Sequence, residues 1–145
     1  MNHYHTLSLV PLITSTALTT IGIEALVSVP SLLKLPSTNV MSQAFSSYFY
    51  GMLGPIIAAG STSSMISSYL YFFRGGNRYF GWGAFFAGLH FAFVPLIMYP
   101  CQTIIENKNQ SSIEPAIKRW IKIHKVRLIG DIMATVCFTL ALREI

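Results

Sequence analysis

Residues 48–73 read YFYGMLGPIIAAGSTSSMISSYLYFF, an uncharged stretch that is long enough to cross a lipid bilayer as a helix. Such a crossing needs about 20 mostly apolar residues. Three other segments, residues 7–33, 79–99 and 120–142, are also mostly apolar and of comparable length. Backbone groups inside a bilayer must bond within the chain, so these runs predict helices and not barrel strands of about 10 residues. The sequence therefore predicts an all-α integral membrane protein, a four-helix bundle with up-down-up-down connections.

The composition favours a membrane protein over a soluble one. Hydrophobic residues make up 52% of the 145 residues and charged residues only 10%, whereas a soluble surface needs about 25–35% charged residues. The net charge of +5 would suit nucleic acid, but most cations border an apolar segment, which favours membrane lipid as the partner and no nucleic acid. We expect one four-span domain over residues 1–145, multi-pass and, in a eukaryote, in an endomembrane such as the endoplasmic reticulum.

The segments between the spans suggest where the helices end. Residues 34–47 are expected to form a polar linker, residues 74–78 a tight basic turn, and residues 100–110 a polar loop. The sequence SSIE at residues 111–114 is a capping-box pattern, so the last helix is expected to begin there. Only residues 128–142 of that helix are fully apolar, which predicts a fourth helix extended beyond the membrane at its N-terminus.

Basic residues suggest how the bundle is oriented. Arg127 apart, six of them lie on the side of the first and third loops and three on the opposite side. The preference for positive charge in the cytoplasm then places loops one and three there. Asn109-Gln110-Ser111 is an N-glycosylation tripeptide that would favour the opposite orientation, so both remain open. Cys101 and Cys137 are expected to be unpaired.

One face of the last span carries polar residues. At about 100° per residue, Trp120, His124, Arg127 and Asp131 share this face. Lysines occupy the opposite face, at Lys118, Lys122 and Lys125. The simplest interpretation is an amphipathic helix whose lysines reach lipid headgroups. However, a charge deep in a membrane costs about 2.5–3.5 kcal/mol, so charges on the packed face indicate a site. Arg127 and Asp131, four residues apart, are expected to offset each other.

Two further ionisable residues are predicted to lie at the depth of this polar face. Glu24 and His90 each precede the end of their span by nine residues, which places both about 14 Å below one surface. Four side chains are therefore expected to meet in one layer: Glu24, His90, Arg127 and Asp131. Trp120 and His124 of the last span are expected to lie above this layer, toward an opening. The alternative is a structural ion pair between Glu24 and Arg127. His90 and His124 differ in their depth in the membrane, which disfavours a haem bound by both histidines. No metal site is expected.

The second span combines small residues with flanking aromatic ones. Small side chains at helical spacing are expected to form a packing seam; they are Gly51, Gly54, Ala58, Ser61, Ser64 and Ser68. Aromatic residues flank most spans, as they do at membrane interfaces. Trp120, His90 and Tyr50 are the candidates for contact with a substrate. A flat ring such as that of Trp120 would stack on a planar aromatic molecule.

These features resemble those of the anthrone oxygenase family, small four-helix membrane proteins of fungi and bacteria, over most of the chain. The resemblance rests on an early acid in span one (Glu24), on Gly51-Met52-Leu53-Gly54-Pro55, and on Trp120-x3-His124-x2-Arg127. It implies a cofactor-independent monooxygenase of secondary metabolism, which uses O2 to oxidise an anthrone-type polycyclic phenol to a quinone. Many members of the family have no assigned reaction.

The residues themselves also support such chemistry. His124 is the candidate general base, because imidazole exchanges protons near neutral pH, and Arg127 would stabilise the enolate oxygen. Asp131 or Glu24 would orient and charge-balance that pair. Other interpretations remain open: a noncatalytic accessory subunit, a protein that binds a hydrophobic metabolite, or a transporter, which would have to form a homo-oligomer because four spans are few.

Overall fold

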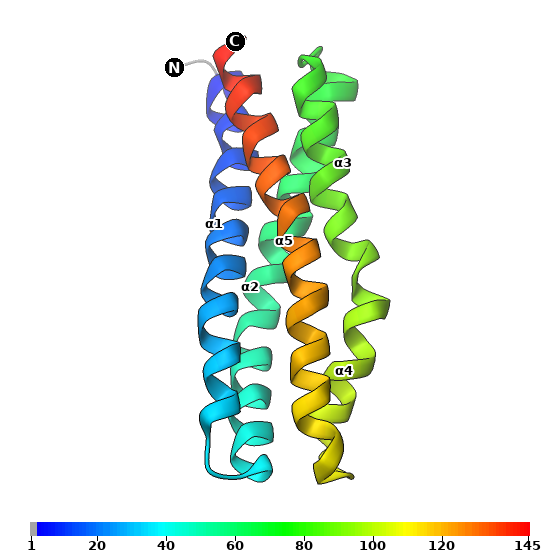
Figure 1. Ribbon diagram of the computed structural model, residues 1–145. Coiled ribbons are helices and arrows are strands. Elements are labelled where there is room, and N and C mark those ends of the chain that lie inside the picture. Colours follow the sequence, from blue (N-terminus) through cyan, green and yellow to red (C-terminus); the bar gives the residue numbers. More distant parts are fainter. Residues whose placement is uncertain (1–2) are drawn as a thin grey trace.

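The computed structural model describes residues 3–145, and all of its regular structure over that range is helical (Figure 1). The long helices are α1 (His3–Ser31), α2 (Thr38–Phe73), α3 (Arg78–Ala92), α4 (Val94–Glu106) and α5 (Ile113–Arg143). Short 3-10 turns follow α1 (Leu32–Lys34) and precede α5 (Gln110–Ser112). Because α4 continues α3 after a bend, the chain forms four columns, which confirms the expected four-helix bundle.

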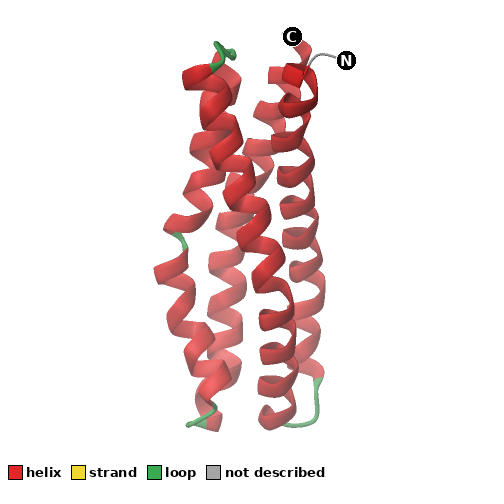
Figure 2. Cartoon of the chain, turned by 180° about the vertical axis from the view of Figure 1, so that it is seen from behind, coloured by secondary structure: helices red, strands yellow, loops and turns green. Residues whose placement is uncertain are grey.

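Each column packs mainly against the two beside it. Helix α1 contacts α2 and α5, and α3 contacts the same two helices, so α1 and α3 lie diagonally. The start of α1 and the end of α5 lie at one end of the bundle, and the α1–α2 and α4–α5 connections lie at the other (Figures 1 and 2). The up-down-up-down order follows from the short connections, which keep consecutive columns antiparallel.

The columns extend beyond the four apolar segments at the end opposite the termini. Residues 38–47 belong to α2 and not to a linker, because Met41 and Phe45, one turn apart, pack in the core. Helix α4 likewise runs to Glu106, with Ile104 fully buried. The first turns of α5 pack against these extensions. The N-terminal extension of the last helix is therefore part of the bundle and packs against the extensions of α2 and α4.

Side-chain caps mark the starts of α2 and α5, and the cap before α5 differs from the one that the sequence suggested. Ser37 accepts the backbone N–H of Val40 at the start of α2. Before α5, the side-chain oxygen of Asn109 accepts the backbone N–H and the hydroxyl of Ser111 at 3.2 and 2.7 Å. Ser111, the first residue of the expected capping box, lies inside the 3-10 turn, and its hydroxyl donates to Asn109. The expected capping box does not form, because an N-cap residue needs an extended backbone.

A bend at Phe93 separates α3 from α4 and is visible as a break in the column (Figure 2). Pro95 has no N–H, and its ring blocks the carbonyl four residues earlier, so the α-helical bonding pattern cannot continue. The N–H of Phe93 instead bonds to the carbonyl of His90 at 3.3 Å. The bend therefore sets how α4 lies beside α2.

Two apolar clusters fill the bundle, one toward each end. The cluster near the α4–α5 connection includes Phe45, Ile104, Ile113, Ile117 and Trp120. The cluster toward the termini includes Leu70, Phe80, Ala134, Phe138 and Ala141. Three buried polar side chains, His90, Arg127 and Asp131, lie at intermediate positions of α3 and α5. The bundle thus has a polar section between two apolar ones.

The small residues of α2 form only part of the expected seam. Gly51 and Gly54 are exposed, and a Cβ built at either would meet nothing within 4 Å. The packed face of α2 instead contains Gly60 and Ser63, both buried, and the Ser63 hydroxyl donates to the carbonyl of Pro11 at 3.1 Å. The close contact of α2 with α1 therefore begins further along the helix than the stripe of small residues indicated.

Two helical segments, Tyr4–Lys34 and Arg78–Glu106, are long and apolar enough to cross a membrane. Helix α2, which is rich in serine, and α5, whose first half carries several charges, are not among these candidate spans. Large apolar side chains are nevertheless exposed on every column, for example Val27, Met65, Leu96 and Ile129. Extensive exposure of this kind marks a surface that contacts another apolar phase or a partner.

We expect Gly83→Ala to destabilise the bundle by about 1–3 kcal/mol, because the added methyl group would overlap the ring of the fully buried Phe138. Gly51→Ala is the matched control. Its methyl group enters open space and replaces a flexible residue within a helix, which should favour folding by about 0.5–1 kcal/mol. Thermal unfolding of both variants in detergent measures the difference. Equal melting temperatures would contradict the close packing of α3 on α5.

Candidate functional site

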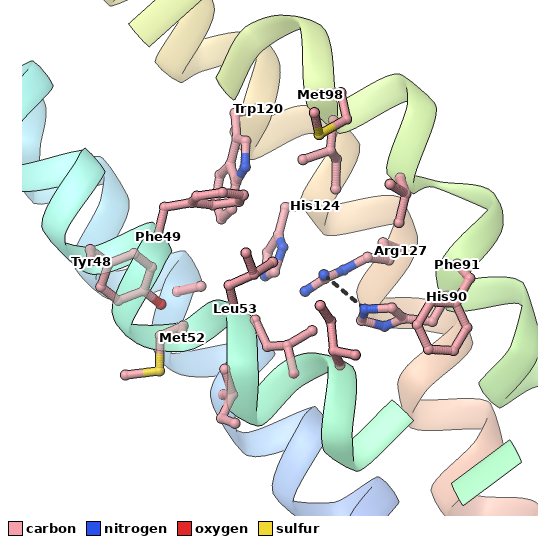
Figure 3. Close-up of a pocket in the computed structure, with 16 residues that line it drawn as sticks. Tyr48, Phe49, Met52, Leu53, His90, Phe91, Met98, Trp120, His124 and Arg127 are labelled. Carbon is pink, nitrogen blue, oxygen red and sulfur yellow. Dashed lines mark hydrogen bonds between the residues drawn. The ribbon is translucent and has the colours of Figure 1, made fainter. Parts of the chain in front are cut away.

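A pocket of about 390 Å3 lies among the four columns (Figure 3). Its walls are mainly aliphatic and aromatic, and its few polar side chains come from α2, α3 and α5. Volumes of roughly 300–1,000 Å3 with a small number of polar groups are typical of small-molecule sites. The pocket is therefore the candidate functional site.

Helix α5 supplies most of the polar groups, and it does so from one face. Trp120, His124, Arg127 and Asp131 are all more than nine-tenths buried, as their shared helix face predicted. The first three line the pocket. The lysines of the same helix are exposed on the other side, at Lys118, Lys122 and Lys125. Residues at spacings of four, seven and eleven return to one side of a helix, which explains this separation.

His90 of α3 lies between Arg127 and Asp131 and connects them. Its Nδ1 is 2.9 Å from Oδ1 of Asp131, and its Nε2 is 3.2 Å from a terminal nitrogen of Arg127 (Figure 3). Arginine only donates hydrogen bonds, so Nε2 of His90 accepts and Nδ1 carries the proton donated to Asp131. Arg127 and Asp131, which were expected to offset each other, are linked through the imidazole of another helix, which lies between them.

The chain of hydrogen bonds from Arg127 through His90 to Asp131 leaves donors of Arg127 free. Its Nε and second terminal nitrogen have no hydrogen-bond partner within residues 3–145, and neither has Oδ2 of Asp131. Buried N–H groups without acceptors are costly. Figure 3 shows the side chain of Arg127 extending from α5 toward the pocket. A ligand that brings an acceptor to this point would satisfy these donors.

His124 is held by the backbone of α1. Its Nε2 is 2.9 Å from the carbonyl oxygen of Gly22. A carbonyl only accepts, so the proton lies on Nε2 and Nδ1 keeps a free lone pair. Nδ1 has no partner in the described part of the chain. Gly22 permits this contact, because a Cβ at that position would lie 2.7 Å from Cδ1 of Leu128.

Trp120 fixes the plane of the His124 ring. The two rings are stacked, with centroids 4.6 Å apart and planes 9° from parallel. Phe45 contacts the indole edge-on, at a centroid distance of 5.7 Å. Trp120 and His124 are 5% and 1% exposed, so they form a buried wall of the pocket. The expectation that they lie toward an opening is wrong, because α1 and α2 cover this face of α5.

Glu24 does not join the polar layer. It is exposed on α1, where one carboxylate oxygen accepts the hydroxyl of Tyr48 at 2.6 Å and the other accepts that of Ser28. Within the described residues it forms no ion pair with Arg127. The next residue, Ala25, takes the inward position and lines the pocket. Counting residues from the end of a span does not give the direction of a side chain, which depends on how α1 is rotated.

Tyr50 lies outside the pocket, and Tyr48 occupies the place expected for it. Tyr50 is 60% exposed, whereas Tyr48, Phe49 and Met52 line the pocket (Figure 3). Two positions along a helix rotate a side chain by about 200°, so Tyr48 and Tyr50 face opposite sides. The recurrence of large side chains at Tyr48, Met52 and Ile56 is the sequence signal that could have identified this face.

The histidines and cysteines near the pocket are not arranged as metal ligands. In the part of the chain that the structure describes, no group of three or more His, Cys, Asp or Glu side chains could hold a metal ion. Both ring nitrogens of His90 are already engaged, and His124 bonds to the backbone. Cys101 and Cys137 are buried and unpaired, as expected.

Comparisons with known proteins do not identify a relative. No family model matches the chain, and neither a curated protein nor a solved structure was found to be similar to it. The functional interpretation therefore rests on the geometry of the pocket and on the residues that line it.

We expect a double-mutant cycle between His90 and Asp131 to show a coupling free energy of about 0.5–3 kcal/mol. His90→Phe keeps a ring in the core but leaves the carboxylate and the guanidinium without their shared partner, which should cost about 3–5 kcal/mol. In an Asp131→Leu background the same change should cost less. Unfolding in detergent measures all four proteins, and His5→Phe, at an exposed position, is the control. Additive effects would show that the two residues do not interact.

Proposed function

We propose that this bundle is embedded in a lipid bilayer as a multi-pass protein. Two candidate spans and the large apolar side chains exposed on every column support this placement. Most exposed lysines lie toward the end that contains the α1–α2 and α4–α5 connections, and positive charge favours the cytoplasmic side. In a eukaryotic cell an endomembrane such as the endoplasmic reticulum is the expected location.

We expect cysteines introduced singly at Ser37 and Lys108 to react with a charged maleimide from the cytoplasmic side of intact vesicles. A cysteine at Arg74, in the connection at the other end, should react only from the opposite side. The reagent cannot cross the bilayer, so labelling before and after permeabilisation makes the measurement. The parent chain, in which Cys101 and Cys137 are buried, is the control. Labelling of all three positions from one side would contradict four spans.

Within this membrane we propose a cofactor-independent oxygenase that acts with O2 on an anthrone-type or related polycyclic phenol. One observation carries the proposal: on one wall of an apolar pocket, a ring nitrogen of His124 and two donor nitrogens of Arg127 have no hydrogen-bond partner among residues 3–145. A base can remove a proton from an activated carbon, and a fixed cation can hold the resulting oxyanion. The Trp120-x3-His124-x2-Arg127 pattern, which resembles that of the anthrone oxygenase family, forms this wall.

The reaction converts a ring CH2 group into a carbonyl, so that anthrone and O2 give anthraquinone and water. Nδ1 of His124 removes one proton and leaves a carbanion whose charge is delocalised onto the ketone oxygen. This anion transfers one electron to O2, and the carbon radical and superoxide combine into a peroxide, which takes back the proton from His124. The peroxide then loses its remaining C–H proton as the O–O bond breaks. Water leaves, and the second carbonyl is formed.

The neighbouring residues would position these two groups. The free N–H groups of Arg127 hold the enolate oxygen, while His90 and Asp131 orient the guanidinium and balance its charge. Trp120 and the Gly22 carbonyl hold the imidazole of His124, so that Nδ1 is the nitrogen available as a base. Groups that are already oriented need little rearrangement during the reaction, which is how such sites lower a barrier.

The pocket also favours a second candidate, a membrane protein that binds a hydrophobic metabolite or acts as an accessory subunit without chemistry. The observation behind it is that the charge of Arg127 is already balanced by Asp131 through His90. A binding protein needs only a cation at position 127. The oxygenase needs the planar guanidinium, which can donate hydrogen bonds to His90 and to the enolate at the same time. Replacement of Arg127 by lysine therefore separates the two functions.

We expect His124→Ala to lower O2 uptake with a simple dihydroxyanthrone by about 10²–10⁴-fold, the usual contribution of a general base. Arg127→Leu should lower it by about 10²–10³-fold, as does loss of one oxyanion donor. Arg127→Lys should also lose most activity if the protein is an oxygenase, but should keep ligand affinity if it is a binding protein. Purified protein in an oxygen electrode makes the measurement.

The matched control for these variants is Tyr50→Phe, because Tyr50 is exposed outside the pocket and should keep the parental rate. Melting temperatures identify any variant that has lost its fold. Parental O2 uptake in both His124→Ala and Arg127→Leu would refute the assigned roles. Tight ligand binding without O2 uptake in the parent chain would favour the binding protein.

A further inference from the structure

The pocket has a lateral opening between α2 and α4. Four of its lining residues are exposed, two on each of these helices and one turn apart: Leu53 and Ile57 on α2, and Val94 and Met98 on α4. The other lining residues are buried or half-buried. Leu53 and Ile57 lie midway along α2, so the opening is on the side of the bundle and not at either end. The bend at Phe93 sets the position of its α4 edge.

The edges of this opening carry no charge. Helix α2 contains no Asp, Glu, Lys, Arg or His from residue 38 to residue 73, and α4 contains none from residue 94 to residue 105. Long uncharged surfaces of this kind match hydrocarbon better than water. In the proposed bilayer placement, lipid chains would therefore cover the opening.

The inner end of the pocket has the opposite character. Arg127 is only 6% exposed, and its Nε and one terminal nitrogen are N–H donors without a partner in residues 3–145. Next to it, Nδ1 of His124 is buried and has no partner among the same residues. Figure 3 shows both side chains extending from α5. A molecule that fills the pocket has to bring an oxygen acceptor to this end, because buried donors without acceptors are unfavourable.

We propose that the substrate enters from the bilayer through the opening between α2 and α4, oxygen end first, and is a lipid-dissolved phenolic ketone that carries an apolar substituent. The oxygen meets the free N–H groups of Arg127, and the aromatic body lies against the apolar walls. The substituent extends between Ile57 and Val94 into the lipid. This proposal rests on the proposed oxygenase function and narrows its substrate class.

The polarity of the opening selects this class over others. An alkyl or prenyl substituent in the opening stays in contact with apolar side chains and lipid chains. A sulfonate or a sugar at the same position would leave a charge or several hydroxyl groups in hydrocarbon, which is strongly unfavourable. A membrane phospholipid fits less well, because its anionic headgroup would have to leave the interface and pass the uncharged edges to reach Arg127.

The test measures ligand binding and turnover separately, with the full chain in lipid nanodiscs. The binding probe is a dihydroxyanthraquinone with an alkyl chain, a product analogue that is not oxidised and whose own fluorescence reports binding. The comparison compound carries a sulfonate at the end of the same chain. We expect the alkylated compound to bind at least about tenfold more tightly, because only the sulfonate has to enter hydrocarbon.

Closing the opening after folding avoids variants that fail to fold. Leu53→Cys places a thiol at the opening, and a bulky maleimide then blocks it. Ile129→Cys, on the outer face of α5, is the matched control because Ile129 is exposed and does not line the pocket. The label at residue 53 should weaken binding and slow O2 uptake at least about tenfold, whereas the label at residue 129 should change neither. The parent chain treated in the same way reports any reaction of Cys101 or Cys137.

The outcomes distinguish this proposal from the proposed function. Unchanged binding and uptake after labelling at residue 53, or equal affinity for the sulfonated compound, would overturn lateral access and leave the oxygenase proposal standing. Binding that the label at residue 53 blocks, in a protein that consumes no O2 with any anthrone, would support lateral access and overturn the oxygenase proposal.

Discussion

The hydrogen-bonded chain from Arg127 through His90 to Asp131 is the interaction on which the middle of the bundle depends. A guanidinium and a carboxylate buried between two apolar clusters would be costly if separate. The imidazole of α3 joins them, because one of its nitrogens accepts and the other donates. The same arrangement connects α3 to α5 and leaves two donor nitrogens of Arg127 without a partner in the part of the chain that the structure describes. The same hydrogen bonds therefore stabilise the fold and orient the Arg127 side chain for binding a ligand.

Helix α5 packs closely against α1 and α3, whereas the pocket is open between α2 and α4. Gly22 and Gly83 let α1 and α3 approach α5 so closely that a Cβ at either position would overlap a side chain of α5. The contact at Gly22 lies at the part of α5 that carries His124. Between α2 and α4, beside the bend at Phe93, exposed apolar side chains line the pocket. The bundle thus combines a fixed polar wall with an apolar opening.

This combination suits chemistry on a molecule that is dissolved in lipid. A carbanion that reacts directly with O2 must be formed where water does not reprotonate it, and apolar walls reduce the access of water. The base and the oxyanion donor come from adjacent turns of one helix, so their relative position is set by helix geometry and by the contacts of His124 with Trp120 and Gly22. In the proposed oxygenase, O2 and the substrate both reach this wall from the hydrocarbon phase.

The sequence alone determined the four columns and the polar face of α5 with its lysines on the other side, because apolar segments and helical periodicity are local properties. It could not determine that His90 would lie between Arg127 and Asp131, that Glu24 would bond Tyr48 on the outside, or that Tyr48 and not Tyr50 would line the pocket. Each of these depends on the rotation of one helix about its axis relative to its neighbours. Only packing among all four columns sets that rotation, through contacts such as Gly83 against Phe138, so the tertiary structure decided which side chains meet.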